Sequence, residues 1–262
     1  MLFRSNNIAR SGFTNAFSST HPDDIVRIVG NGGLDDNIDT LGDNFPYEVG
    51  FGTAGGPPVL EDGTELAVPQ GVTVMIDPGS IFKMRRSRVG VGSSSLTVNR
   101  GGGALQVLGT PERNVYFTSW LNENIGRDSH APTTSANRGD WGGIVFRADI
   151  DNSESRSNLE DAGIFLNYVN HANISYGGGG NVVIGGIQQV FNPIQMVETR
   201  PTITFNRITN SADSAMSASP NSFDETNFHS PRFQAAGIFT SDYERIGPDI
   251  HSNFLLDRKS VV

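Results

Sequence analysis

The stretch 66-LAVPQGVTVMIDPGSIFKM-84 contains three short apolar segments that are separated by Pro- and Gly-containing turns. The segments 66-LAV-68, 72-VTVMI-76 and 81-IFKM-84 are rich in aliphatic residues, several of them β-branched. Such residues favour strands, whereas Pro and Gly favour the turns that end them. The stretch therefore predicts three short strands joined by tight turns.

Similar segments recur along most of the chain, and from residue 74 onward many of their centres lie roughly 8 to 14 residues apart. This spacing suggests a sandwich, a barrel or a solenoid. The other segments are 25-IVRIV-29, 96-LTV-98, 104-ALQVL-108, 115-VYFTS-119, 144-IVF-146, 164-IFLNYV-169, 173-NISY-176, 182-VVI-184, 189-QVF-191, 202-TITF-205 and 238-IFT-240.

Two features of this pattern favour the solenoid. Asn-Gly and Asp-Gly pairs, which mark antiparallel hairpins, are scarce between the segments, where Asp62-Gly63 is the one example. The segments also group in threes, with roughly 22 to 30 residues per group, as in a parallel β-helix. We therefore predict an all-β chain that folds as a single-stranded right-handed parallel β-helix (solenoid) of roughly six to eight coils. Residues 1–60 are expected to form an irregular N-terminal capping region, and residues 61–262 the β-helix.

A short repeat supports the solenoid. Val169-Asn170-His171-Ala172 resembles Thr209-Asn210-Ser211-Ala212. Asparagine adopts left-handed backbone conformations more readily than most residues, and stacked amides can form a ladder. We therefore assign Asn170 and Asn210 a structural role as equivalent positions about two coils apart.

Composition limits the partners. The formal net charge is −9, so nucleic acid is not expected to bind. Cysteine is absent, and no apolar run is long enough to cross a membrane as a helix, so membrane insertion is not expected. The one dense basic run, Lys83 to Arg88, is predicted to be a solvated turn.

The order of motifs resembles a known family. The stretch 66–84, then 104-ALQVLGTPERNVYFTS-119, then 139-GDWGGIVF-146 are similar to the right-handed parallel β-helix (pectin-lyase-like) segments of large exported bacterial surface proteins. The resemblance covers roughly residues 60 to 253. The resemblance implies a secreted or cell-surface location and a chain that is covalently part of a longer protein and is cut inside a coil. Members of this family usually have no demonstrated catalytic activity.

The function expected from this resemblance is a non-catalytic structural or adhesin-like segment that contacts extracellular polysaccharide. The alternative is a carbohydrate-active enzyme, a polysaccharide lyase or glycoside hydrolase. For that alternative Arg147, Asp149 and Asp151 are the catalytic candidates, because alternate residues after 144-IVF-146 share one face of an extended strand.

Other candidates concern ligands. Trp120, Tyr168 and Tyr176 are aromatic residues that can stack on sugar rings if they are exposed. No cofactor is expected, although the acidic stretch that includes Asp35, Asp36 and Asp39 is a candidate calcium loop without EF-hand spacing. Residues 120–140 and 211–236 lack strand patterning and are predicted to be excursions from the coils.

The motif 139-GDWGGIVF-146 is expected to be a corner of the β-helix. Asp140 ends an excursion, and Trp141 covers the end of a core stack. Gly142 and Gly143 allow the chain to turn into the following strand.

Overall fold

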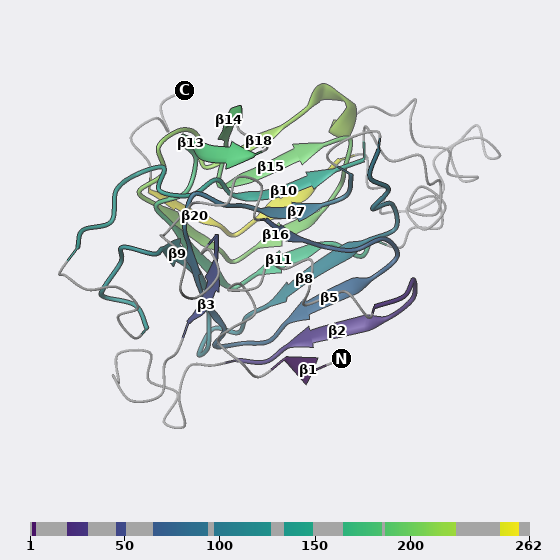
Figure 1. Cartoon of the computed structure of the whole chain (residues 1–262), viewed down its shortest axis with the longest axis horizontal. Coiled ribbons are helices and arrows are strands. Elements are labelled where there is room, and N and C mark those ends of the chain that lie inside the picture. The colour runs from purple at the N-terminus through teal and green to yellow at the C-terminus, as the bar shows by residue number, and fades with distance from the viewer. Residues whose placement is uncertain are drawn as a thin grey trace.

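The computed structural model describes residues 2–3, 20–30, 46–50, 65–93, 97–126, 134–148, 165–184, 187–223 and 247–256. Within these residues, strands form three parallel sheets and the chain passes from one sheet to the next in turn (Figure 1). The protein is a right-handed parallel β-helix, so the predicted fold class is confirmed.

Sheet A has seven strands and contains both the first and the penultimate strand of the described chain. In spatial order its strands are β1 (Leu2–Phe3), β2 (Ile25–Ile28), β5 (Thr73–Ile76), β8 (Ala104–Leu108), β11 (Tyr168–Asn170), β16 (Thr202–Thr204) and β19 (Asp249–His251).

Sheets B and C have six and five strands. Sheet B contains β3 (Tyr47–Val49), β6 (Ile81–Met84), β9 (Val115–Ser119), β12 (Ala172–Ser175), β17 (Arg207–Thr209) and β20 (Phe254–Leu256). Sheet C contains β4 (Leu66–Ala67), β7 (Val89–Val91), β10 (Ile144–Arg147), β15 (Ile194–Val197) and β18 (Met216–Ala218).

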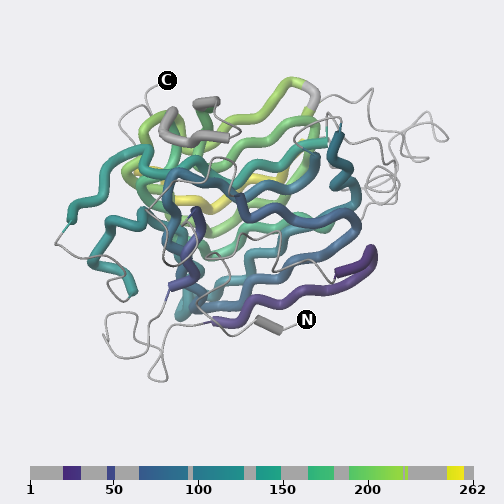
Figure 2. The backbone as a smooth tube through the Cα atoms, viewed as in Figure 1, coloured from purple at the N-terminus to yellow at the C-terminus, as the bar shows by residue number. Residues whose placement is uncertain are grey.

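The described residues trace six successive passages from sheet A to sheet B, which agrees with the predicted six to eight coils. Figure 2 shows the coils stacked from the purple N-terminal end toward the green C-terminal part. Successive coils differ widely in length. The separation between stacked positions is 34 residues for Asn170 and Thr204, 47 for Asn206 and Asn253, and 62 for Leu105 and Asn167. These coils are longer than the predicted 22 to 30 residues because excursions are inserted between their strands.

Alternate residues of each strand point into one continuous apolar core. In β11, Val169 is fully buried, whereas its neighbours Tyr168 and Asn170 are partly exposed. Rings stack along the core, with centroids 5.2 Å apart for Tyr47 and Phe82 and 4.9 Å apart for Phe82 and Phe117. Burial of each such side chain stabilises the fold by about 1.5–3 kcal/mol, so the stacked core accounts for the regular register of the coils.

Residues with left-handed backbone conformation form the corners between sheets A and B. His171, Phe205 and Ser252 have φ values of 46°, 56° and 57° and follow β11, β16 and β19. Because strands β11, β16 and β19 are paired in register, these three residues occupy the same corner in successive coils. The corner is therefore a repeated element, although it contains no glycine in these coils.

Several predicted segments behave differently in the structure. The segments 182–184 and 189–191 belong to an antiparallel hairpin, β13 (Gly179–Ile184) and β14 (Ile187–Phe191), rather than to the solenoid. The predicted excursion 211–236 contains strand β18 and a 3₁₀ helix, η1 (Pro220–Phe223). The segment 238–240 lies outside the described residues.

The boundary expected at residue 60 stays a prediction, because most of residues 1–60 lie outside the described part. Within that region, β2 pairs in parallel with β5 and β3 pairs with β6.

Candidate ligand-binding site

The outer face of sheet A carries a regular array of polar side chains. Register places Tyr168, Thr202 and Asp249 side by side on three successive strands, and Asn170, Thr204 and His251 in the next outward column. Neighbouring strands lie about 4.8 Å apart, so each column repeats a polar group at this interval. We call these six residues the polar stripe.

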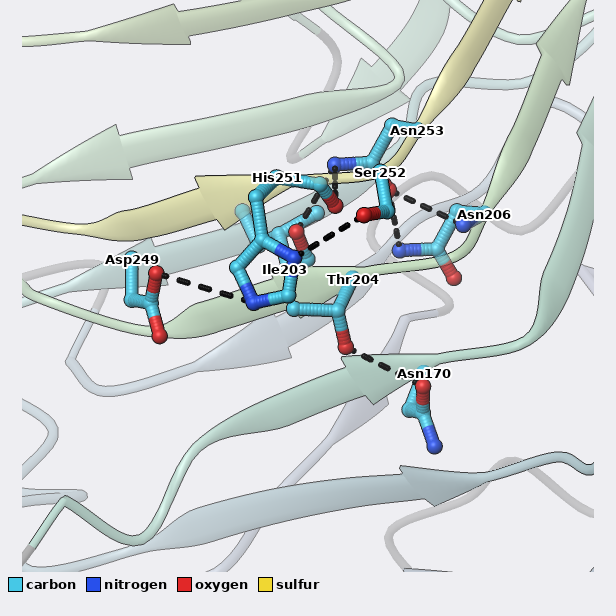
Figure 3. A network of polar contacts seen from close by, with 8 residues as sticks. All are labelled: Asn170, Ile203, Thr204, Asn206, Asp249, His251, Ser252 and Asn253. Atoms are coloured by element: carbon cyan, nitrogen blue, oxygen red, sulfur yellow. Dashed lines mark hydrogen bonds and ion pairs between the residues drawn. The ribbon is translucent and has the colours of Figure 1, made fainter.

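Side chains within the polar stripe are linked to one another (Figure 3). The Thr204 hydroxyl donates a 3.0 Å hydrogen bond to Oδ1 of Asn170, and the same oxygen lies 2.9 Å from Nδ1 of His171. On the last strand, Nδ1 of His251 lies 3.1 Å from the Ser252 hydroxyl. These contacts orient the side chains. Asn170 is half-buried and His251 is exposed, whereas Thr204 is 7% exposed.

The His251 ring of the polar stripe lies beside two further rings, His171 and Phe205, at the corner between sheets A and B. The rings of His171 and Phe205 stack with their centroids 5.0 Å apart. The rings of Phe205 and His251 meet edge to face, with their centroids 5.7 Å apart. Phe205 is 50% exposed. An exposed aromatic residue beside fixed polar groups is an arrangement that suits the mixed apolar and hydroxyl surface of a sugar.

An asparagine ladder lies directly beneath this corner. Oδ1 of Asn206 accepts a 2.8 Å bond from the Ala172 N–H, and Nδ2 of Asn206 donates a 2.7 Å bond to the Val169 carbonyl. Asn253 repeats both contacts one coil later, toward the Asn206 N–H at 2.9 Å and the Ile203 carbonyl at 2.7 Å. The ladder holds successive coils in register, so the polar stripe above it has a rigid base.

The predicted ladder was assigned to the wrong residues. Asn170 is level with Thr204 at the end of sheet A, whereas Asn210 follows sheet B and is level with Tyr176. The two asparagines therefore occupy different corners, and an offset of 34 residues, not 40, separates equivalent positions of these two coils. Asn210 does have the left-handed conformation expected of it, with φ of 55°.

The described residues on the outer face of sheet A do not bring two carboxyl groups to the separation found in glycosidases. Nε2 of His251 lies 3.9 Å from Asp249, beyond hydrogen-bond range, and both side chains are substantially exposed. The next carboxylate along this face, Asp77, lies four strands away, or about 19 Å at the usual strand spacing. Glycosidases place their two carboxyl groups about 5–9.5 Å apart.

At the other end of the face, Asp77 is already engaged. Both of its carboxylate oxygens lie 2.8 Å from Nε of Arg27. This hydrogen bond raises the pKa of the Arg27 guanidinium. Asp77 and Arg27 therefore form an ion pair that joins two successive coils.

The aromatic candidates lie at two separate places. Tyr168 belongs to the polar stripe, whereas Trp120 and Tyr176 follow the ends of β9 and β12, near the corner between sheets B and C. The Arg85 guanidinium lies 4.4 Å from the centre of the Trp120 ring and covers part of it. Tyr168 is therefore the aromatic candidate that adjoins fixed polar groups.

The catalytic and calcium candidates are mostly outside the described residues. Arg147 ends strand β10 on sheet C, but Asp149 and Asp151 are not described, nor are Asp35, Asp36 and Asp39. No group of three His, Cys, Asp or Glu side chains suited to a metal occurs in the described part of the chain. Nor does that part contain a helix that is long and apolar enough to span a membrane.

The motif 139–146 is a corner in the structure. The Trp141 ring is fully buried and stacks 6.3 Å from Phe117, and its indole N–H donates a 2.8 Å bond to the Ser175 carbonyl. Asp140 accepts bonds from the Ser119 hydroxyl at 2.6 Å and the Asn137 N–H at 2.7 Å. These contacts fix the end of the excursion against sheet B.

Glycine is required at one position of this corner. A Cβ atom on Gly143 would lie 2.0 Å from the Asn192 carbonyl oxygen in the next coil, and hence no other residue fits without a shift of the backbone. Gly142 donates its N–H to Ser87 and accepts from Gly178, which ties the corner to coils on both sides.

Sequence reasoning missed a buried charge cluster on the outer side of sheet C. Nε of Arg88 lies 2.5 Å from one oxygen of Glu65, and Arg100 binds the other oxygen. Burial raises the pKa of Glu65, but the charges and hydrogen bonds of Arg88 and Arg100 outweigh it and leave the pKa below its ordinary value. The Phe191 ring lies 4.9 Å from the Arg88 guanidinium and covers it.

The prediction that Lys83 to Arg88 forms a solvated turn is wrong for much of the run. Lys83 is fully buried, and Ser87 and Arg88 are 2% and 3% exposed. Lys83 lies within β6 and Arg88 directly before β7, and the Phe191 ring at the end of β14 covers the Arg88 guanidinium. Runs of charge predict solvent exposure only when nothing covers the face.

None of the family models, curated proteins or solved structures compared with this chain matches it. The parallel β-helix is therefore established by the sheet topology, and the origin of the chain in a pectin-lyase-like surface protein remains a prediction.

Proposed function

We propose that this protein is a non-catalytic β-helix segment of an exported or cell-surface protein and that it binds polysaccharide along the polar stripe. The observation that carries the proposal is the in-register array of Tyr168, Asn170, Thr202, Thr204, Asp249 and His251 on the outer face of sheet A.

The array suits an extended polymer better than a compact ligand. Its hydrogen-bonding groups repeat from coil to coil along the solenoid, and the exposed Phe205 ring adjoins them at one side. A glycan chain lying along the stack would meet hydroxyl, amide and carboxylate groups in successive coils. Because the side chains are held by neighbouring contacts and by the rigid coils, little conformational entropy is lost on binding.

The test uses the purified chain and a panel of neutral and acidic polysaccharides, with binding measured by isothermal titration calorimetry in the presence and absence of calcium. Saturable binding to at least one polysaccharide is expected, with an affinity reduced at least fivefold by Asn170→Ala or Tyr168→Ala. Asn173→Ala is the matched control, because Asn173 is an equally half-buried asparagine of the same coil in sheet B.

Two results would contradict the proposal. Binding that is equally weakened by Asn173→Ala would place the ligand elsewhere or show a general loss of folding. Release of unsaturated or reducing sugar ends during incubation would favour the enzymatic alternative.

A further inference from the structure

One turn of the β-helix contains the only Asp-Pro bond in the sequence, between Asp77 and Pro78. The turn 77-DPGS-80 joins β5 to β6 at the corner between sheets A and B. Asp-Pro bonds hydrolyse more readily than other peptide bonds in mild acid, because the aspartate carboxylate can attack its own carbonyl carbon. The proline nitrogen is also more basic than other amide nitrogens and accepts a proton readily as it leaves. The surroundings of this bond therefore decide how long it persists.

The carbonyl oxygen of Asp77 accepts two hydrogen bonds from the same turn. The Ser80 N–H donates to it at 3.3 Å, and the Ser80 hydroxyl donates to it at 2.8 Å. Ser80 is fully buried, so both bonds are shielded from water. Donors placed on a carbonyl oxygen stabilise the negative charge that the oxygen acquires when its carbon is attacked. The Asp77 carbonyl is therefore activated toward a nucleophile.

Both neighbouring coils hold the turn in place. A Cβ atom on Gly30 would lie 2.2 Å from the Pro78 carbonyl oxygen, so the preceding coil packs directly against the turn. In the following coil, the Asn114 carbonyl accepts a 3.1 Å bond from the Gly79 N–H. The activated carbonyl and its two donors stay aligned because the backbone around them is fixed.

The carboxylate that would attack this carbonyl is engaged in an ion pair. Both carboxylate oxygens of Asp77 lie 2.8 Å from Nε of Arg27, on the neighbouring strand β2. A carboxylate that accepts hydrogen bonds from a guanidinium is a weaker nucleophile, and it must leave this partner before it can attack. The Arg27 side chain is 60% exposed and that of Asp77 is 12% exposed. Because the arginine side of the pair faces solvent, salt weakens the pair.

We propose that the Asp77–Pro78 bond is a self-cleavage site and that the ion pair with Arg27 holds it in check. When the pair opens, a carboxylate oxygen of Asp77 attacks the Asp77 carbonyl carbon, and the two Ser80 donors stabilise the resulting oxyanion. The bond to the Pro78 nitrogen then breaks as that nitrogen takes a proton from the solvent. This leaves a cyclic anhydride, which one water molecule opens to the two carboxyl groups of Asp77. The inference is independent of polysaccharide binding.

Cleavage of the purified, folded chain is followed at pH 5 and 37 °C by intact-mass spectrometry. The wild-type chain is expected to cleave slowly, and Arg27→Met at least tenfold faster, at the single bond before Pro78. Arg27→Lys keeps a positive charge beside the carboxylate and is expected to cleave more slowly than Arg27→Met. Arg207→Met is the matched control and should behave as the wild type, because Arg207 is likewise an exposed arginine on a strand.

Two double variants separate the chemistry from an effect on folding. Arg27→Met with Asp77→Glu keeps a carboxylate but lengthens the ring that the attack must close, so cleavage is expected to be lost. Arg27→Met with Ser80→Ala lacks the hydroxyl donor and is expected to cleave at least fivefold more slowly than Arg27→Met alone. In the wild type, a raised salt concentration is expected to accelerate cleavage without any substitution.

An Arg27→Met chain that stays as intact as the wild type while circular dichroism shows it folded would overturn the proposal. So would cleavage at another bond, or cleavage that is equally fast when Asp77 is replaced by Glu. A wild-type rate that does not respond to salt would show that the ion pair does not control the bond.

Discussion

The indole N–H of Trp141 donates a hydrogen bond to the backbone carbonyl of Ser175, which lies one coil further along the stack. The ring is fully buried beside Phe117. One side chain therefore ends an excursion, fills the core and joins two coils.

Replacement of Trp141 should destabilise the protein more than replacement of the other tryptophan. Trp141→Phe removes the bond to the buried Ser175 carbonyl and leaves a cavity, and a loss of about 2–4 kcal/mol in the free energy of unfolding is expected. Trp120→Phe, at a half-buried corner, is the control and should cost about 1 kcal/mol or less. Urea unfolding followed by circular dichroism measures both, and equal losses would contradict the structural role of Trp141.

The asparagine ladder gives a second prediction. Asn206→Ala leaves the Ala172 N–H and the Val169 carbonyl without their partner, and each unsatisfied buried group costs about 1–3 kcal/mol. A lowered urea midpoint with an unchanged slope is expected. Asn173→Ala should leave the midpoint within error, because Asn173 lies on the outer face of sheet B. A neutral Asn206→Ala would show that the ladder does not hold the coils.

The Glu65 cluster predicts a loss of stability in acid. The folded-state pKa of Glu65 lies below its ordinary value of 4.5, because the charges and hydrogen bonds of Arg88 and Arg100 outweigh the effect of burial. Its contribution is therefore complete above about pH 5 and is lost as the pH falls through the folded-state pKa. Glu65→Gln should cost about 3–5 kcal/mol at pH 7, because it leaves Arg88 buried without its partner.

The pH dependence of that variant is the sharper measurement. The difference in unfolding free energy between wild type and Glu65→Gln should shrink steadily from pH 5 downward. Glu112→Gln, at an exposed turn, should follow the wild type at every pH. A constant difference between pH 7 and pH 3 would show that Glu65 does not titrate as part of the cluster.

The raised pKa of Tyr47 predicts a loss of stability as the pH rises into the alkaline range. Burial, with a contribution from Asp77, raises the pKa of Tyr47 to about 12, and its hydroxyl donates a 2.7 Å bond to the Val29 carbonyl. Its contribution is present below pH 10 and is lost between pH 10 and pH 12, because the unfolded chain ionises first. Tyr47→Phe should cost about 1 kcal/mol at pH 7 and less as the pH rises. Thermal unfolding monitored at pH 7, 10 and 11 measures this, and an unfolding penalty that grows with pH would contradict it.

Sequence patterns predict the architecture well, because each strand is marked by aliphatic residues that are close together in the sequence. The segments 72–76, 104–108 and 115–119 each contain the strand found there, since alternating aliphatic residues require one buried face. Short strands such as Val89–Val91 were missed because their glycine and flanking arginines obscure the pattern. The hairpin β13–β14 cannot be told from solenoid strands by its sequence, because a short apolar strand has the same composition in either arrangement.

The site was less predictable because it depends on register. Tyr168 was a candidate from its residue type alone, but the alignment of Asn170 with Thr204 and His251 follows from excursions of unequal length. The same lengths caused Asn170 to be matched with Asn210 rather than with its neighbour in space. The burial of Arg88 depends on Glu65, which precedes it by 23 residues, and on Phe191, which follows it by 103 residues.

The unequal coil lengths have a consequence for engineering. Stacked positions in successive coils are 34, 47 or 62 residues apart in the sequence, yet the strands of all these coils pair in parallel. We therefore expect that the segments between strands can be shortened or exchanged while the strand pairing beneath them is preserved. The solenoid would then serve as a scaffold on which several grafted loops are presented at set intervals along one axis.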